Sequence, residues 1–131
     1  MFGFRKRKSN LFPSDSRGRR ETIMSIHRYV AHDDLMRDGD TIDLLLELIS
    51  DESDPFLRSA YVIYYIGSYK PFVNGNEETA RRIADLILAD DGWTIPQTSC
   101  FLNMFQRACA NSYDIEEIGR WEKANAERLV R

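Results

Sequence analysis

The sequence predicts an all-α protein of about six helices, arranged as stacked helical hairpins in a short solenoid or as a helical bundle. Three observations support this fold class. Apolar residues recur at spacings of three and four in successive segments. Residues that cap or terminate helices separate these segments. The stretch YVIYYI at 61–66 has high β propensity, but helical signals flank it on both sides, so we expect it to be helical too.

The first three helices follow from their caps and apolar spacing. The first helix is predicted to begin at Glu21, and the second after a cap at Asp40 or Thr41. Asp54 suits the N-cap of the third helix, and Pro55 suits its first position because a missing N–H costs nothing there. The inward positions of the first two helices are Ile23, Ile26, His27 and Val30, followed by Ile42, Leu45, Leu46 and Ile49.

The last three helices show the same kind of signal. Asn76 is predicted to cap the fourth helix, which ends where Gly92 can adopt the left-handed conformation. The fifth helix is predicted to start at Pro96. Asp114 and Glu117 have the spacing of a capping box and begin the sixth. Three consecutive hairpins, at 21–50, 55–90 and 96–130 or in another pairing, must then pack side by side because one hairpin cannot bury its apolar stripe alone.

Charge divides the chain into two parts. Residues 1–20 hold seven Lys or Arg against one Asp, a net charge of +6, whereas residues 21–131 hold 11 against 20 acids, a net charge of −9. We expect the first part to be a mostly disordered basic tail and the second to be a single helical domain. The tail residues that suit phosphates or an anionic membrane are Arg5, Lys6, Arg7 and Lys8.

The remaining composition fits a cytoplasmic protein. No run approaches the roughly 18 apolar residues of a membrane helix, and the charged N-terminus lacks the apolar region of a secretory signal. Cys100 and Cys109 are too far apart on one helix for a disulfide, so both are expected to be buried and reduced.

Acidic residues concentrate between positions 33 and 54, where nine carboxylates accompany one cation, Arg37. Like charges at this density repel one another unless something basic neutralises them. Two interpretations stay open, namely a solvated acidic face with helix caps, or a docking surface that steers a basic protein. The candidate partner-binding acids are Asp33, Asp34, Asp38, Asp40, Asp43 and Glu47.

Tyrosine is concentrated in the third helix, where Tyr61, Tyr64 and Tyr65 share one side. A helix that is apolar over so much of its circumference is either central in the fold or partly exposed for a partner. Trp93, in the turn DDGWT, either closes an edge of the core or contacts a partner. Because Tyr and Trp are favoured at binding hot spots, we name Tyr61, Tyr65 and Trp93 as candidate partner-binding residues.

Residues 44–67 resemble a HEAT repeat. The matching features are a leucine-rich first helix, an acidic turn with Pro55, the pair Leu57–Arg58, the small residue Ala60 and the closing Gly67. A second, weaker unit spans about 82–105, with Pro96 where the first unit has Arg58. The resemblance implies helix pairs stacked into a curved surface that binds other proteins.

Motifs for catalysis or metal binding are not found in the sequence. A calcium loop that starts at Asp34 fails at Met36 and Leu45, where oxygen ligands are required. His27 and His32 are five residues apart on one helix and so point to different faces. The glycines are scattered, and the Cys/His spacing is not that of a metal site. We therefore predict no catalytic residue, no metal and no cofactor.

These features together favour a protein-binding module. Its most specific form is an immunity or inhibitor protein that occludes a basic toxin or nuclease through its acidic surface. One alternative is an adaptor or regulatory protein whose basic tail contacts nucleic acid or membrane. The other is a small enzyme whose catalytic groups assemble from distant positions.

Overall fold

The computed structural model describes residues 11–129 of the chain, and these are mostly helical. The helices are α1 (Ser16–Ala31), α2 (Gly39–Ser50), α3 (Pro55–Val62), the π-helical segment η2 (Ile63–Ser68), α4 (Asn76–Asp90), α5 (Ser99–Cys109) and α6 (Ile115–Asn125). Two short strands, β1 (Trp93–Thr94) and β2 (Glu127–Arg128), complete the described elements. The predicted all-α class is confirmed.

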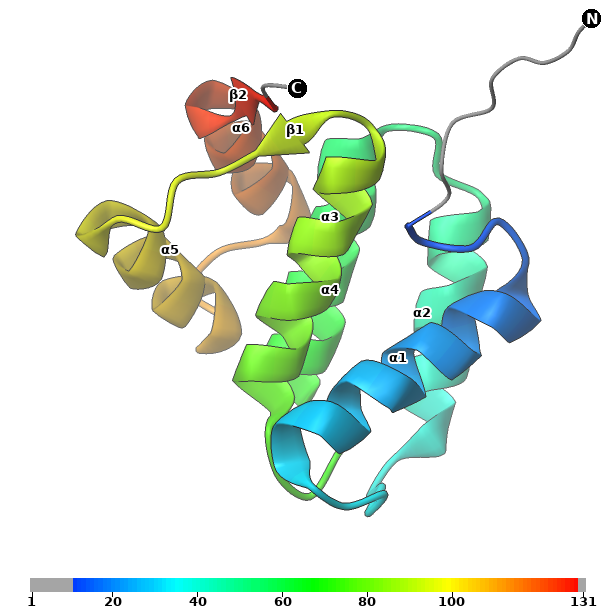
Figure 1. Cartoon of the computed structure of the whole chain (residues 1–131). Helices are drawn as coiled ribbons and strands as arrows, with labels where there is room; N and C mark the ends of the chain where they lie inside the picture. The colour runs from blue at the N-terminus through cyan, green and yellow to red at the C-terminus, as the bar shows by residue number, and fades with distance from the viewer. Residues whose placement is uncertain (1–10, 130–131) are drawn as a thin grey trace, which may run out of the picture.

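The continuous helix formed by α3 and η2 lies beside α4 in the middle of the molecule (Figure 1). The blue and cyan helices α1 and α2 lie to one side of this pair, and α5 lies to the other. α3 packs on α2, α4 and α6, while η2 packs on α2, α4 and α5. This arrangement around a central helix fits the bundle form of the prediction. Kinship with HEAT repeats stays a prediction.

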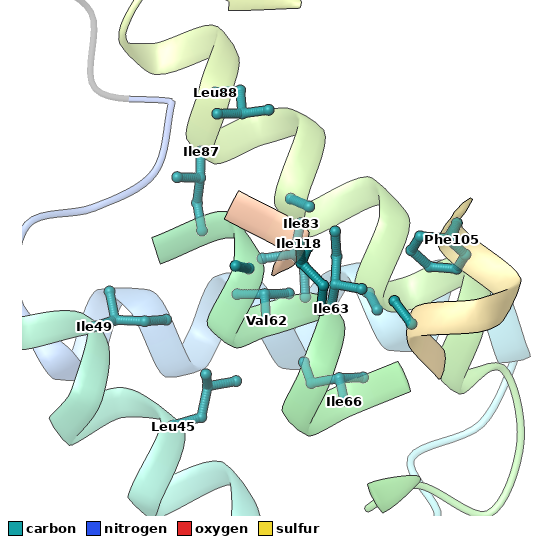
Figure 2. Packing of buried hydrophobic residues seen from close by; sticks show 14 of the residues in the cluster. Leu45, Ile49, Val62, Ile63, Ile66, Ile83, Ile87, Leu88, Phe105 and Ile118 are labelled. Atoms are coloured by element: carbon teal, nitrogen blue, oxygen red, sulfur yellow. The ribbon is translucent and has the colours of Figure 1, made fainter. Parts of the chain in front are cut away.

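The core is built from the predicted apolar stripes. Figure 2 shows side chains from α2, α3, η2, α4, α5 and α6 converging on one cluster. Its labelled members are Leu45, Ile49, Val62, Ile63, Ile66, Ile83, Ile87, Leu88, Phe105 and Ile118. Each fully buried aliphatic side chain contributes about 1.5–3 kcal/mol to folding through the removal of apolar surface from water.

Several predicted caps are confirmed. The side chain of Asp54 accepts a hydrogen bond from the Phe56 amide at 2.9 Å, with Pro55 as the first helical residue. Asp114 and Glu117 form a reciprocal capping box at the start of α6. At the end of α4, the glycine at position 92 adopts a φ of +83°, the left-handed conformation that ends the helix.

Two other predicted starts are wrong. Asp38, not Asp40 or Thr41, caps α2, because its carboxylate accepts from both the amide and the hydroxyl of Thr41, at 3.2 and 2.9 Å. α5 begins at Ser99 and not at Pro96, because the Thr98 hydroxyl accepts from a first-turn amide and fixes the start there.

The structured part of the chain begins before Glu21. α1 starts at Ser16, and Asp15 caps it by accepting from the Gly18 amide at 2.6 Å. Phe12 and Arg19 are each only 5% exposed. The expected disorder is therefore wrong for residues 11–20, because an apolar ring and an arginine stem from this segment pack on the helical domain. Residues 1–10 lie outside the described part.

The π-helical geometry of η2 is a second departure from the sequence pattern. It lies where the chain approaches α5 most closely, and a Cβ at Gly67 would overlap the Sγ of Cys109. π turns widen a helix locally and are often found at functional sites. The predicted third helix thus forms from Pro55 to Ser68, with a change of winding at Ile63 that no periodicity signals.

The two cysteines are free, so the predicted lack of a disulfide between them is confirmed. Cys109 is buried in the core, as expected. Cys100 is exposed near the start of α5, which makes the expectation of burial wrong for this residue. The fifth helix turns its Phe101 and Met104 inward, and the residue before Phe101 then falls on the outer face.

Candidate functional site

The loop that leads into α4 is fixed to the segment before α2 by backbone hydrogen bonds. The carbonyl of Pro71 accepts from the amides of Arg37 and Asp38 at 2.7 and 2.9 Å. The amide of Val73 donates to the carbonyl of Leu35 at 3.1 Å. We call the paired segments 33–38 and 69–76 the platform. Their pairing ties two parts of the chain that lie more than thirty residues apart in the sequence.

Side chains from α1 and α4 hold the platform from inside. The Asn76 side chain accepts from the Phe72 amide at 2.9 Å and donates to its carbonyl at 2.8 Å. The His27 ring stacks on the Phe72 ring, with centroids 3.8 Å apart, and its Nε2 bonds the carbonyl of Asn74 at 2.9 Å. Asn76 therefore has a different role from the predicted N-cap, since it braces the preceding loop.

The backbone of the platform loop includes two left-handed residues, Lys70 with a φ of +53° and Gly75 with a φ of +75°. A side chain at position 75 would also press on Val30 and Ala31 of α1. A non-glycine residue adopts positive φ only where the surroundings determine it. The contacts of Phe72 and Asn76 supply that determination, so the loop is a rigid element.

Apolar side chains point outward from this rigid base. Leu35 is 55% exposed, Tyr69 51% and Val73 47%. Met36 and Phe72 form an antiparallel bridge, which makes Leu35 and Val73 direct cross-strand neighbours on the same side. We call Leu35, Tyr69 and Val73 the apolar trio.

The acids predicted to bind a partner lie on the platform and on α2, and several have partners within the chain. Asp33 accepts from the Leu35 amide at 2.9 Å, and this hydrogen bond is the main cause that lowers the pKa of Asp33. Asp34 pairs with Arg28 at 2.8 Å. These two acids hold the platform loop in shape while their carboxylates remain at the surface.

On α2, the outer face carries Asp40, Asp43 and Glu47 at helical spacing. Asp43 forms an ion pair with Arg20. Within residues 11–129, Asp40 and Glu47 are exposed and form no ion pair. The predicted acids thus divide into those with partners in the chain, such as Asp34 and Asp43, and exposed acids without an ion pair among the described residues, Asp40 and Glu47.

The tyrosines form a continuous cluster, which we call the tyrosine cluster (Tyr61, Tyr64, Tyr65 and Tyr69). Its ring centroids are 5.2 to 6.4 Å apart in four contacts. The prediction that Tyr61, Tyr64 and Tyr65 share one side is confirmed by these contacts. Burial is the main cause that raises the pKa of Tyr64 and of Tyr65, and Tyr69 adds to the effect. Through Tyr69, the cluster reaches the platform.

Trp93 is half-buried and is covered by its own chain. Its ring lies 5.6 Å from the ring of Phe56, and the guanidinium of Arg128 lies 4.6 Å above it. Of the two interpretations of this residue, the structure favours the one in which it closes an edge of the core. Trp93 could contact a partner through this face of its ring only after the Arg128 guanidinium moves away from it.

A groove of about 500 Å³ lies between α1 and α4. Arg81 in this groove is bound to Glu78 at 2.5 Å and to Asp85 at 3.3 Å, so its charge is already neutralised. Burial raises the pKa of Asp85 to about 6, against the opposing effect of Arg81. The Asp85 side chain is 41% exposed, so water screens much of this effect. Arg82 is paired with Glu78 at 2.8 Å, so among the described residues each charged side chain that lines the groove already has a partner of opposite charge.

The predicted separation of the two histidines is confirmed. His27 is fully buried under the platform, whereas His32 is exposed and ends α1 with a φ of +61°. Over the described range, no group of three or more His, Cys, Asp or Glu side chains could hold a metal ion.

One buried acid was missed in the sequence. Glu122 is 1% exposed and accepts a hydrogen bond from the Ser59 hydroxyl at 2.7 Å. Its spacing from Ile115 and Ile118 already places it on the inward face of the sixth helix, and that signal was available. The tail candidates Arg5, Lys6, Arg7 and Lys8 lie outside the described residues.

Comparisons with protein-family models, with curated proteins and with solved structures found no match to this chain. Between residues 11 and 129, none of the helices has the length and apolar character needed to cross a membrane.

Proposed function

We propose that this chain acts by binding another protein, with the platform as the docking site. The observation that carries the proposal is the apolar trio, Leu35, Tyr69 and Val73, which is about half exposed on a rigid, hydrogen-bonded base. Grouped apolar side chains rimmed by polar residues are typical of protein-binding surfaces. A partner that covers these residues gains the free energy of their burial.

Rigidity favours this site over a flexible loop. The platform is braced by Asn76, by the stacked His27 and Phe72 rings and by the pairing of residues 33–38 with 69–76. Binding to a surface that already has its bound shape costs less conformational entropy. Tyr69 adds a large ring with a polar tip, a residue type enriched at hot spots.

The charge near the platform favours a basic partner. Asp40 and Glu47 are exposed on α2, which directly follows the platform segment 33–38, and Asp33 and Asp34 belong to that segment. Such a field steers a basic protein during the encounter and raises the association rate. The most specific form of the proposal is an immunity or inhibitor protein that occludes a basic toxin or nuclease. The HEAT resemblance supports protein binding in general, and the two free cysteines fit a cytoplasmic location.

The experiment first uses the full chain to capture a partner from native lysate treated with nuclease. Binding of this partner to the full chain is then compared with its binding to two sets of variants. The partner is then purified, and its binding kinetics are measured at low and high salt. The double variant Leu35→Asp, Val73→Asp should lose at least about 30-fold in affinity, because a hot spot is worth about 2 kcal/mol or more. The matched control is Leu102→Asp, since Leu102 is 49% exposed on α5, away from the platform.

The contribution of the acidic side chains to association is tested separately by the double variant Asp40→Asn, Glu47→Gln. This variant should slow association and weaken its salt dependence while leaving dissociation nearly unchanged. Equal binding by wild type and the Leu35/Val73 variant, or an equal loss in the Leu102 control, would remove the platform as the docking site. A partner without enzymatic or toxic activity would remove the inhibitor form alone. Recovery of only lipid, or of only nucleic acid when the nuclease is omitted, would favour the adaptor alternative.

A further inference from the structure

α6 and β2 contact the rest of the molecule at α3, at α5 and at β1, and Trp121 of α6 packs on Phe101 of α5 with ring centroids 5.9 Å apart. Along its length α6 packs on α3, where Gly119 allows close approach, because a Cβ there would lie 3.0 Å from Leu57 Cδ2. After α6, the chain turns back, and β2 pairs with β1. The amide of Leu129 also donates to the carbonyl of Gly92 at 2.9 Å. In Figure 1, this C-terminal unit lies at one end of the molecule.

A carboxyl group is buried in the first of these attachments. Glu122 projects from α6 onto α3, where its Oε2 accepts from the Ser59 hydroxyl at 2.7 Å. Its Oε1 is buried and has no hydrogen-bond partner among residues 11–129. A buried carboxylate that lacks a cation or a full set of donors is costly, whereas a neutral carboxyl group is much less so.

The groups that face Glu122 leave it without a compensating charge. α3 offers the Ser59 hydroxyl, and α4 offers a second acid, Asp85. Arg81 of α4 is bound to Asp85 and Glu78. On the strands, Arg128 lies over the Trp93 ring. Across the described chain, no basic side chain forms an ion pair with Glu122.

Burial raises the pKa of Glu122 to about 8. The hydrogen bond from Ser59 opposes this change, and the charge of Asp85 adds to it. When α6 separates from α3, the carboxyl group meets water and returns to its ordinary pKa of 4.5. The attached and detached states of α6 therefore bind different numbers of protons between these two values.

We propose that α6 and β2 form a pH-sensitive latch, closed over α3 while Glu122 carries its proton and loosened as the carboxyl group ionises. Opening uncovers the apolar α3 side chains under α6, among them Leu57 and its neighbour Phe56. The latch is separate from the platform, so it stands whether or not the platform binds a partner.

The direction and size of the effect follow from the linkage between proton binding and conformation. The open state loses its proton near pH 4.5, and the closed state keeps it to about pH 8, so stability of the closed state falls between these values and levels off above them. From pH 6 to pH 8, the opening constant rises about 50-fold. Below about pH 4.5, both states are protonated and the dependence disappears.

Hydrogen exchange measured on the full chain tests the latch. Amide exchange of residues 115–125 is followed at pH 6 and pH 8, and each rate is divided by the intrinsic rate at that pH to give the opening constant. Wild type should show the roughly 50-fold rise, and Glu122→Gln should show none, because the amide is isosteric and does not titrate.

Two further variants should move the effect in opposite directions. Ser59→Ala removes the hydrogen bond that favours the charged form, so the rise should become larger and should level off at a higher pH. Asp85→Asn removes the neighbouring negative charge, so the rise should become smaller. A structural loss alone would not give opposite changes in the pH profile.

Three results would overturn the latch. In the first, the opening constant of α6 in wild type does not change between pH 6 and pH 8. In the second, Glu122→Gln keeps the same pH dependence as wild type. In the third, protection of α3 and α4 falls together with that of α6, which would show that the whole domain unfolds and that no separate element opens.

Discussion

Replacing Asn76 with Ala should destabilise the protein by removing the brace of the platform. The Asn76 side chain satisfies both the amide and the carbonyl of Phe72, at 2.9 and 2.8 Å, and both groups are buried. In the alanine variant, the amide loses the hydrogen bond that satisfies it. The carbonyl keeps a second donor, Nη2 of Arg37 at 3.2 Å.

The magnitude follows from these two losses. An unsatisfied buried amide costs about 1–3 kcal/mol, and the loss of one of two hydrogen bonds at the carbonyl costs about 0.5–1.5 kcal/mol. We therefore expect Asn76→Ala to lower the free energy of unfolding by about 2–4 kcal/mol. Such an amount is a large fraction of the total free energy of unfolding of a domain of this size.

Urea denaturation of wild type and variant gives the comparison, provided that the denaturant slope is unchanged. Asn125→Ala is the matched control, because Asn125 also donates from Nδ2 to a backbone carbonyl, that of Trp121 at 2.8 Å, but is exposed. Water replaces the lost bond there, so the cost should stay within about 0.5 kcal/mol. The reasoning fails if Asn76→Ala costs less than about 0.5 kcal/mol, or if the control costs as much.

Three further predictions concern single contacts of the fold. Gly67→Ala should lower the free energy of unfolding in denaturant by about 1–3 kcal/mol, because the added methyl group overlaps the Cys109 sulfur. Adding Cys109→Ala to this variant should recover part of the loss, and an equal cost of Gly67→Ala with and without Cys109 would exclude the overlap. Asp114→Ala should cost about 1 kcal/mol because it removes the capping box of α6, and an unchanged unfolding midpoint would contradict this role. At pH 8, a thiol reagent should modify exposed Cys100 rapidly and Cys109 only on unfolding, because burial raises the pKa of Cys109 to about 12; two fast thiols would contradict the packing of α5.

Local patterns in the sequence were enough to predict the helices. A cap such as Asp54 or Asp114 bonds an amide two or three residues away, and an apolar stripe repeats within one turn. Both signals are therefore contained in a short stretch of chain. The starts of α2 and α5 were predicted wrongly for the same kind of reason, because several neighbouring side chains could serve as the cap and only the folded backbone selects one.

The candidate site was predicted only in part. Composition identified the acids and the tyrosines, but it did not separate Asp33 and Asp34, which have partners in the chain, from Asp40 and Glu47, which are free of ion pairs within the described residues. The preference of Trp for binding hot spots also suggested Trp93 as a partner contact, whereas Phe56 and Arg128 cover that ring.

The sequence by itself determined the fold class, the order of the helices and the caps at Asp54, Gly92 and Asp114, because these depend on residues within a few positions of each other. Only the tertiary structure decided which surface is rigid and which groups surround the buried carboxyl of Glu122. The platform joins residues 33–38 to residues 69–76, and the latch joins Ser59 to Glu122. Such pairings depend on how helices pack on one another, and no local pattern in the sequence specifies the partner that a side chain meets.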